Sequence, residues 1–396
     1  MTWTRFGGTK DFVAGVFLLA MAISHLAMAL GVAPLLRSGY QDFTIFYTAG
    51  KLVRSGQTAA LYDLAAQYRA QQEFAPGVHV RRAALPYNHA PFEALFFVPL
   101  AFFAYFPAYL IWTVLNLIML AVALVLLRKQ FAPTLAPVLL SLAALGFFPI
   151  AIALIQGQDT ILLLLISVLG LVFLDQKRDV TAGAVLAIGL FKFHLIAPLV
   201  VLLAIRRPRL LTGFLPVAAV FAGVSVAMLG WDGAARYVQF VLHLEKSGAG
   251  AIVSDMPNLR GLIAVLPRIS AAAGLTTLLS LVLSAAVFVI ALQRMHRDSL
   301  SSAFALAALT SILISYHTLA YDLSLLFPGA VFLFAGMRDA RNISGRAAVL
   351  PMLLLFFTPL YVLLWLHLDR LCWLALVLVW LFVALARTRA VTERPA

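Results

Sequence analysis

The chain has 396 residues, of which 63% are hydrophobic and 11% charged, and its formal net charge is +13. A soluble chain of this length cannot bury so many apolar side chains, so the composition excludes a soluble protein and indicates an integral membrane protein. The single cysteine, Cys372, excludes an intramolecular disulfide and a cysteine metal site.

The first apolar run extends from Phe12 to Ala33 and follows the basic residues Arg5 and Lys10. It is longer than the hydrophobic core of a signal peptide, so we expect it to be retained as a membrane span. Asp42 follows shortly afterwards, where a carboxylate outside the membrane suits a general base that takes a proton from an acceptor hydroxyl. Alternatively, Asp42 caps a helix that begins near Phe43, because Asp is favoured at helix N-caps.

Apolar runs continue along the rest of the chain, and several are shorter than the ~20 residues that a straight span requires. We therefore expect some of them to be buried, bent or re-entrant helices. The first of these runs is long enough to contain a re-entrant helix, and the sequence leaves open whether residues 91–104 span the membrane. The runs are Pro91–Leu127, Thr134–Ile155, Thr160–Leu174, Val180–Phe191, Leu195–Ile205, Leu210–Gly230, Ala272–Leu292, Ala303–Tyr316, Leu323–Met337, Ala347–His367 and Leu371–Ala386.

The runs Val180–Phe191 and Leu195–Ile205 decide the predicted topology. Read as one helix, they place Lys192 and His194 in mid-membrane, which is costly. Read as two helices, they place both residues at the outer face and most loop Lys and Arg in the cytoplasm, as the positive-inside rule requires. We therefore expect about twelve crossings of the inner cell membrane, with both termini cytoplasmic. The cytoplasmic clusters are then Arg128/Lys129, Lys177/Arg178, Arg206/Arg207/Arg209, Arg294/Arg297, Arg338/Arg341/Arg346 and Arg387/Arg389/Arg394.

This topology turns two long loops outward, at about residues 34–90 and 231–271. Within the first loop, Phe43–Val53 and Leu64–Phe74 mix polar and apolar residues at the spacing expected of short helices that lie along the membrane interface. The sequence contains no linker or internal repeat, so we expect residues 1–396 to form one all-α polytopic membrane domain. Its positive charge then faces anionic lipid rather than nucleic acid.

Polar side chains end several spans on this outer face. Lys, Arg and His side chains can hold a phosphate by charge-assisted hydrogen bonds. The candidate phosphate ligands on this face are therefore Lys192, His194, Arg260 and His317. The alternatives are that Lys192 extends its ammonium group to the interface, that the histidines are satisfied interfacial residues, and that Asp159 caps the helix after it. The substrate-binding candidates are Lys192, His194, Arg260, His317, Gln158, Asn88, His89 and Glu93.

Several chemistries lack their sequence motifs. There is no HExxH, no Asp-x-Asp pair and no His/Asp cluster at metal-ligand spacing, so we expect no metal. There is no P-loop and no Gly-rich dinucleotide motif, so we expect no cofactor and no nucleotide donor.

A set of short motifs lies in order along the chain. They are Asp42…Tyr47…Ala49-Gly50…Gly56…Leu61-Tyr62-Asp63, Tyr87-Asn-His-Ala-Pro91-Phe-Glu-Ala-Leu…Pro99-Leu, Gly157-Gln158, Ala182-Gly183…Gly189-Leu-Phe-Lys192…Pro198…Arg206-Arg207, Asn258-Leu-Arg-Gly261 and Ser315-Tyr-His317…Tyr321. This ordered set resembles glycosyltransferase family 87, the PimE-type mannosyltransferases that use polyprenyl-phosphate mannose and have the GT-C fold. One departure is Asn88-His89-Ala90-Pro91, where the family usually has Tyr-x-Pro-Pro.

The resemblance implies that Asp42 is the catalytic base, that His317 is an active-site histidine and that Lys192 ends a short helix beside the site. The implied partners are a polyprenyl-phosphate sugar, a lipid or glycan acceptor and membrane lipids. A leaving phosphate stabilised by Lys, Arg and His requires no metal. One base without a second carboxylate nucleophile suits a single displacement, which inverts the sugar carbon.

Two other functions fit a chain of this kind. A transporter or flippase for a lipid-linked glycan would place charged residues in mid-membrane and often shows repeated halves, and neither feature is visible in the sequence. A ligase of the O-antigen type, which joins lipid-linked glycans, would share the large outer loops. Its donor would carry an oligosaccharide on a diphosphate instead of one sugar on a monophosphate.

Overall fold

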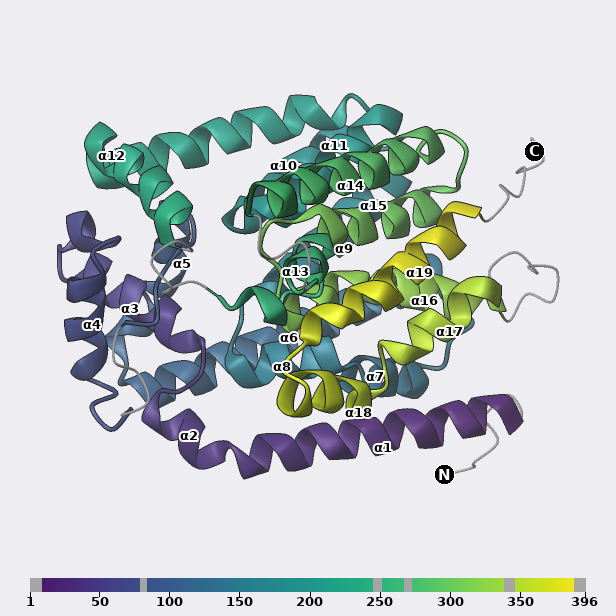
Figure 1. The fold of residues 1–396 in the computed structure, drawn as a ribbon, viewed down its shortest axis with the longest axis horizontal. Coiled ribbons are helices and arrows are strands. Elements are labelled where there is room, and N and C mark those ends of the chain that lie inside the picture. The colour runs from purple at the N-terminus through teal and green to yellow at the C-terminus, as the bar shows by residue number, and fades with distance from the viewer. Residues whose placement is uncertain (1–8, 79–83, 245–250, 267–272, 338–345, 388–396) are drawn as a thin grey trace.

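The computed structural model describes residues 9–78, 84–244, 251–266, 273–337 and 346–387. Every regular element in these ranges is a helix, which confirms the predicted all-α class (Figure 1). Four of the arginines predicted to be cytoplasmic, Arg338, Arg341, Arg389 and Arg394, lie outside the described residues, as do parts of both predicted outer loops.

Five helical stretches among the described residues are long and apolar enough to cross a membrane, and two bent pairs raise this number to seven. The chain is therefore a multi-pass membrane protein by length and composition, while the expected twelve crossings stay a prediction. The five candidates are α1 (Thr9–Gly31), α6 (Tyr105–Phe131), α12 (Leu210–Leu244), α14 (Ala273–Arg294) and the stretch Asp179–Arg206.

Two of the predicted apolar runs are broken. α7 (Pro137–Leu145) meets α8 (Phe148–Gln156) at 63°, and α17 (Arg346–Leu354) meets the α18 segment at 59°. α8 and α18 (Thr358–Val362) each carry a proline in their first turn. Proline fits there because the missing N–H would have no partner, whereas further into a helix it breaks the hydrogen-bond ladder.

The stretch Asp179–Arg206 folds back on itself. α10 (Asp179–Ile188) and α11 (Phe193–Arg206) are joined by a 3-10 turn, and Lys192 has the non-helical angles φ −112° and ψ 59°. A Cβ atom on Gly183 would collide with the Leu210 carbonyl, so these residues touch. A straight helix would carry Arg206 about 35 Å from Gly183, farther than the four following residues reach, at about 14 Å. The two-helix prediction is therefore confirmed, with Lys192 at the apex.

The helix α3 (Phe43–Arg54) is almost entirely buried, which contradicts the expected position along the membrane interface. Its aromatic residues pack with Phe97 and with the start of α6 into a second core beside the main one, for example Phe46 on Phe97 and Phe43 on Tyr109. Gly50 lies directly against the Phe97 backbone, where a side chain would not fit. Thr44, Tyr47 and Thr48 of α3 donate hydrogen bonds to backbone carbonyls inside the protein, so the mixed pattern does not mark a surface helix.

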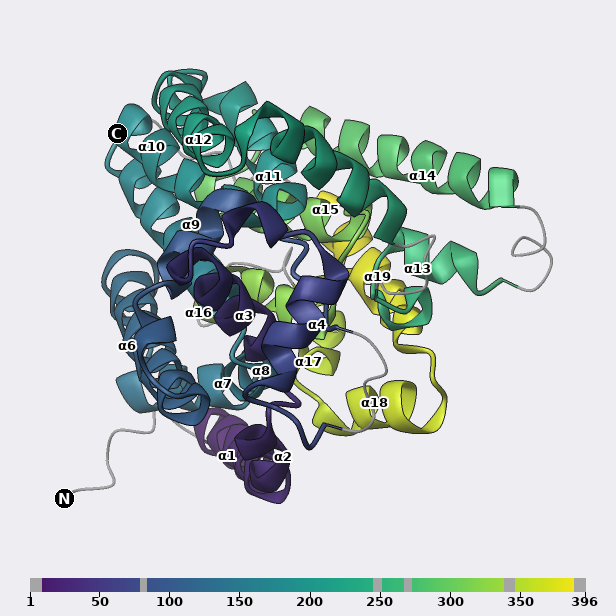
Figure 2. The same cartoon turned by 90° about the vertical axis from the view of Figure 1, so that its left-hand side faces the viewer.

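The C-terminal part of α12 packs against the same end of the bundle as α3. α12 bends at Gly230 (φ 70°, ψ 171°), and its last part packs over the first loop through Tyr237 and Phe240 on Tyr62. Figure 1 shows α1 and α12 on opposite edges of the bundle, with α2 (Ala33–Ser38), α3, α4 (Leu64–Gln72) and α5 (Ala94–Phe97) gathered at one end, which Figure 2 views directly. The remaining helices are α9 (Thr160–Asp175), α13 (Leu259–Ala264), α15 (Leu300–Ile314), α16 (Phe327–Met337) and α19 (Leu374–Arg387).

Candidate active site

A cavity of about 290 Å³ lies where the start of α3, the α8–α9 connection, the Lys192 apex and the segment after α15 meet. One part of its wall is apolar and includes the largely exposed Ile252, together with Trp365 and Leu371. The rest is polar, and the polar residues come from segments far apart in the sequence. They are Asp42, Asn88, His89, Gln156, Gln158, Lys192, His194, Asp255, Tyr316, His317 and Tyr321.

Asp42 occupies the N-cap position of α3 but makes no side-chain capping hydrogen bond. Its Oδ2 instead accepts a hydrogen bond of 2.7 Å from Nε2 of Gln158, and its backbone N–H donates to Oε1 of Gln156 at 3.0 Å. The capping alternative therefore does not explain this aspartate. Two glutamines of the α8–α9 connection hold Asp42 at the cavity wall, where a carboxylate can accept a proton from a bound hydroxyl.

The segment Leu85–His89 is held in place by side-chain amides of α4. Gln71 both donates to and accepts from the Leu85 backbone, at 2.9 and 3.0 Å, and Oε1 of Gln67 accepts from the Tyr87 N–H at 2.8 Å. The Tyr62 hydroxyl donates to the His89 carbonyl at 2.7 Å. These bonds satisfy buried backbone groups that have no ladder partner and fix the wall that carries His89.

Lys192 is buried and bridges two carboxylates. Its Nζ lies 3.1 Å from Oδ1 of Asp159 and 2.9 Å from Oδ1 of Asp322. The ammonium group therefore does not extend to the interface, and Asp159 does not cap α9 with its side chain. Buried charges persist when they are paired in this way.

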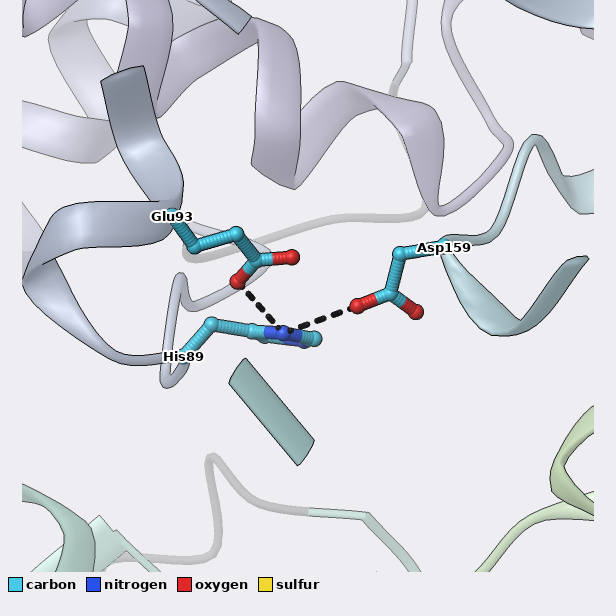
Figure 3. A group of neighbouring side chains, drawn as sticks. All are labelled: His89, Glu93 and Asp159. Carbon is cyan, nitrogen blue, oxygen red and sulfur yellow. Dashed lines mark ion pairs between the residues drawn. The ribbon is translucent and has the colours of Figure 1, made fainter. Parts of the chain in front are cut away.

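His89 joins this network through the same aspartate (Figure 3). Its Nδ1 lies 2.8 Å from Oε2 of Glu93 and 3.4 Å from Oδ2 of Asp159. Burial lowers the pKa of His89, but the carboxylates of Glu93 and Asp159 outweigh it and raise that pKa to about 9. Burial, reinforced by Asp159 and opposed by His89, raises the pKa of Glu93 to about 8.

Asp159 carries the fixed negative charge of this cluster. Burial acts to raise its pKa, but the ammonium of Lys192 and the ring of His89 more than offset burial and lower it. Lys192 and His89 thus lie among the carboxyl groups of Asp159, Asp322 and Glu93. Pairing of this kind avoids the cost of an isolated buried ion.

The same three side chains could reach one metal ion, because ligand atoms of His89, Glu93 and Asp159 lie within 4.8 Å of one another. Such a trio offers a nitrogen and two carboxylate oxygens, a donor set that zinc accepts. The ammonium of Lys192 already neutralises Asp159, however, and would repel a divalent cation. We therefore describe the group as an ion-pair network.

His194 and His317 lie beside each other, with ring centroids 5.9 Å apart. Both line the cavity. Nε2 of His194 is buried and has no hydrogen-bond partner among the described residues. A buried polar atom of this kind is costly unless something fills its bonding position, and a ligand in the cavity would do so.

Two predicted site residues lie away from the cavity wall. Nη1 of Arg260 donates to the Tyr316 carbonyl at 2.7 Å, and Glu93 lies behind His89. Asp255, which the sequence analysis did not select, does line the cavity. Burial and the nearby Asp369 raise the pKa of Asp255. Nothing in its local sequence distinguishes it from other loop aspartates.

An all-helical apolar bundle with a polar cavity at one end defines a multi-pass membrane protein with a candidate enzyme site. The family model of glycosyltransferase family 87 matches residues 87–315, more than half of the chain, and the chain belongs to that family. It is accordingly a membrane glycosyltransferase, with a sugar donor and an acceptor. No curated protein and no solved structure matches the chain.

Proposed function

We propose that the protein transfers a hexose, mannose in the first instance, from a polyprenyl-phosphate donor to a lipid or glycan acceptor. The observation that carries the proposal is that Asp42 lines the same cavity as Lys192, His194 and His317. One carboxylate that can receive a proton thus lies in a chamber with three nitrogen donors that can hold a phosphate.

The reaction is a single displacement. The acceptor oxygen attacks the sugar carbon, its proton passes to Asp42, and the bond from that carbon to the phosphate oxygen breaks, which leaves polyprenyl phosphate and inverts the carbon. Protein side chains stabilise the charge that develops on the leaving phosphate, so the displacement needs no metal. The apolar wall around Ile252, Trp365 and Leu371 supports a donor whose lipid chain leaves the cavity toward the bilayer.

In this proposal the cavity opens on the periplasmic face of the inner membrane. The support comes from charge: basic clusters such as Arg206/Arg207/Arg209 then lie in cytoplasmic loops, while the Lys192 apex lies on the outer side. Donors built on polyprenyl phosphate suit that face, because the lipid carries the activated sugar without a nucleotide.

Purified protein is incubated with radiolabelled polyprenyl-phosphate mannose and a membrane extract, and labelled products are separated. We expect a labelled product that is absent with GDP-mannose as the only donor and absent with the Asp42→Asn protein. Transfer from GDP-mannose would overturn the donor assignment. Transfer only from an oligosaccharide on polyprenyl diphosphate would identify a ligase instead.

A further inference from the structure

His89 lines the same cavity as His194 and His317. Glu93 and Asp159 both lie against its Nδ1, which leaves Nε2 as the ring nitrogen that can donate into the cavity. The side chain keeps 11% of its surface exposed, although the two carboxylates behind it are closed to solvent. The ring packs edge-to-face on Phe46 and stacks on Tyr87, at centroid distances of 5.0 and 5.7 Å.

We propose that His89 is a further catalytic residue, which donates an Nε2–H hydrogen bond to the donor phosphate, and that Asp159 and Glu93 are the positioning residues that orient it. This inference rests on the proposed function and adds a phosphate contact to it. When the bond between the sugar carbon and the phosphate oxygen breaks, its electron pair stays on that oxygen. The imidazolium of His89 stabilises the added negative charge without releasing its proton, and the acceptor proton goes to Asp42.

Asp159 gives the arrangement its stability. Its two oxygens face different cations, Oδ1 toward Lys192 and Oδ2 toward His89, so one carboxylate holds both cavity cations in place. A donor phosphate therefore meets groups that are already charged and oriented, which reduces the reorganisation required during the reaction. The titratable groups next to His89 include Glu93, Asp159, His194 and Tyr87, and Lys192 lies against the other oxygen of Asp159.

The test measures binding of farnesyl phosphate, a short lipid phosphate without a sugar, to the purified full-length protein, with farnesol as the control that lacks the phosphate. Between pH 8 and 10 the phosphate is almost fully ionised, because its second pKa is about 6. His89 and Glu93 both lose protons in that range, and each loss makes the site more negative. Affinity for farnesyl phosphate, and not for farnesol, is expected to fall as the pH rises.

His89→Gln is expected to weaken farnesyl phosphate binding at pH 7 by about 10- to 100-fold, the effect of one charge-assisted hydrogen bond, and to flatten the pH profile. Asp159→Asn removes the negative charge that raises the pKa of His89, so its loss of affinity is expected at lower pH than in the wild type. Asp298→Asn, an aspartate in an ion pair with Arg294 away from the cavity, is the matched control and is expected to keep the wild-type profile.

Unchanged affinity and an unchanged pH profile in His89→Gln would overturn the inference, even if Asp159→Asn fails to fold. A loss that is equal for farnesyl phosphate and farnesol would also overturn it, because a structural defect affects both ligands. This binding test can be separated from the proposed function. If His89→Gln loses farnesyl phosphate binding while the wild-type protein transfers no mannose, His89 remains a phosphate ligand and mannose is rejected as the donor sugar.

Discussion

Nζ of Lys192 lies 2.9 Å from Oδ1 of Asp322, a residue 130 positions further along the chain. The pair fastens the apex between α10 and α11 to the 3-10 segment Ala320–Leu326. Oδ2 of Asp322 in turn accepts from the Leu319 N–H at 2.8 Å, so one side chain orders both the lysine and the backbone after His317. The cavity floor thus depends on a long-range ion pair.

Replacement of Lys192 should therefore affect stability as well as activity. Lys192→Met leaves Asp159 and Asp322 as buried carboxylates without their shared cation, and we expect a loss of about 3–5 kcal/mol in the free energy of unfolding. Lys51→Met breaks the more exposed pair with Glu73 and should cost about 0–1 kcal/mol. Thermal unfolding in detergent compares the two, and equal midpoints would contradict the buried-pair interpretation.

Asp42→Asn keeps the size of the side chain and its bond partners but cannot accept a proton. We expect turnover to fall by about 10²–10⁴-fold, the usual contribution of a general base, with donor affinity retained. Asp255→Asn is the comparison, because Asp255 is the other carboxylate on the cavity wall that is not committed to the Lys192 network. If Asp255→Asn is the inactive protein and Asp42→Asn turns over normally, Asp255 is the base.

His317 and Arg260 should differ as phosphate ligands. His317 lines the cavity, so His317→Gln should raise the KM for the donor by about 10- to 100-fold, the value of one charge-assisted hydrogen bond. Arg260 is turned to the Tyr316 carbonyl, so Arg260→Ala should change that KM much less. Steady-state kinetics at saturating acceptor separate the two, and a larger effect of Arg260→Ala would place the phosphate outside the cavity.

Chelation tests the metal-independent displacement. Because Lys192 already neutralises Asp159, we expect EDTA to leave turnover unchanged and added Mg²⁺, Mn²⁺ or Zn²⁺ not to stimulate it. Metal content of the purified protein is measured in parallel. Activity that disappears with EDTA and returns with one cation, together with loss of that cation in Glu93→Gln, would establish a metal site at His89, Glu93 and Asp159.

Membrane topology is testable with an impermeant thiol reagent in a Cys372→Ser background. Single cysteines are placed at exposed positions, because Gln158, Lys192 and Met256 are too buried to react. Trp231 and Asp369 should label from the periplasmic side, while Lys177 and Arg209 should label only after the membrane is opened. Labelling of Lys177 from the same side as Trp231 would invert the proposed orientation.

The sequence was sufficient for the helical class and for the break at Lys192, because both follow from composition and from the placement of basic residues. It also selected Asp42, which follows the first apolar run, and Gln158, Lys192 and His317, which lie near the ends of later runs. Asp159 and Asp322 were not selected, because their partner Lys192 is distant in the chain and an aspartate before a helix reads as a cap. The burial of α3 was missed because its covering residues come from other segments.

The close crossing of α10 and α12 has a mechanical consequence. Gly183 and Gly213 lie against the backbones of Leu210 and Val180, with no space for a methyl group. Lys192 lies nine residues beyond Gly183, about 13 Å along the helix axis. A side chain added at this crossing would push α10 away from α12. Because Lys192 follows the far end of α10, its ammonium group would then move away from Asp159 and Asp322. Substitutions at these two glycines therefore damage the distant cavity while every residue that lines it stays intact.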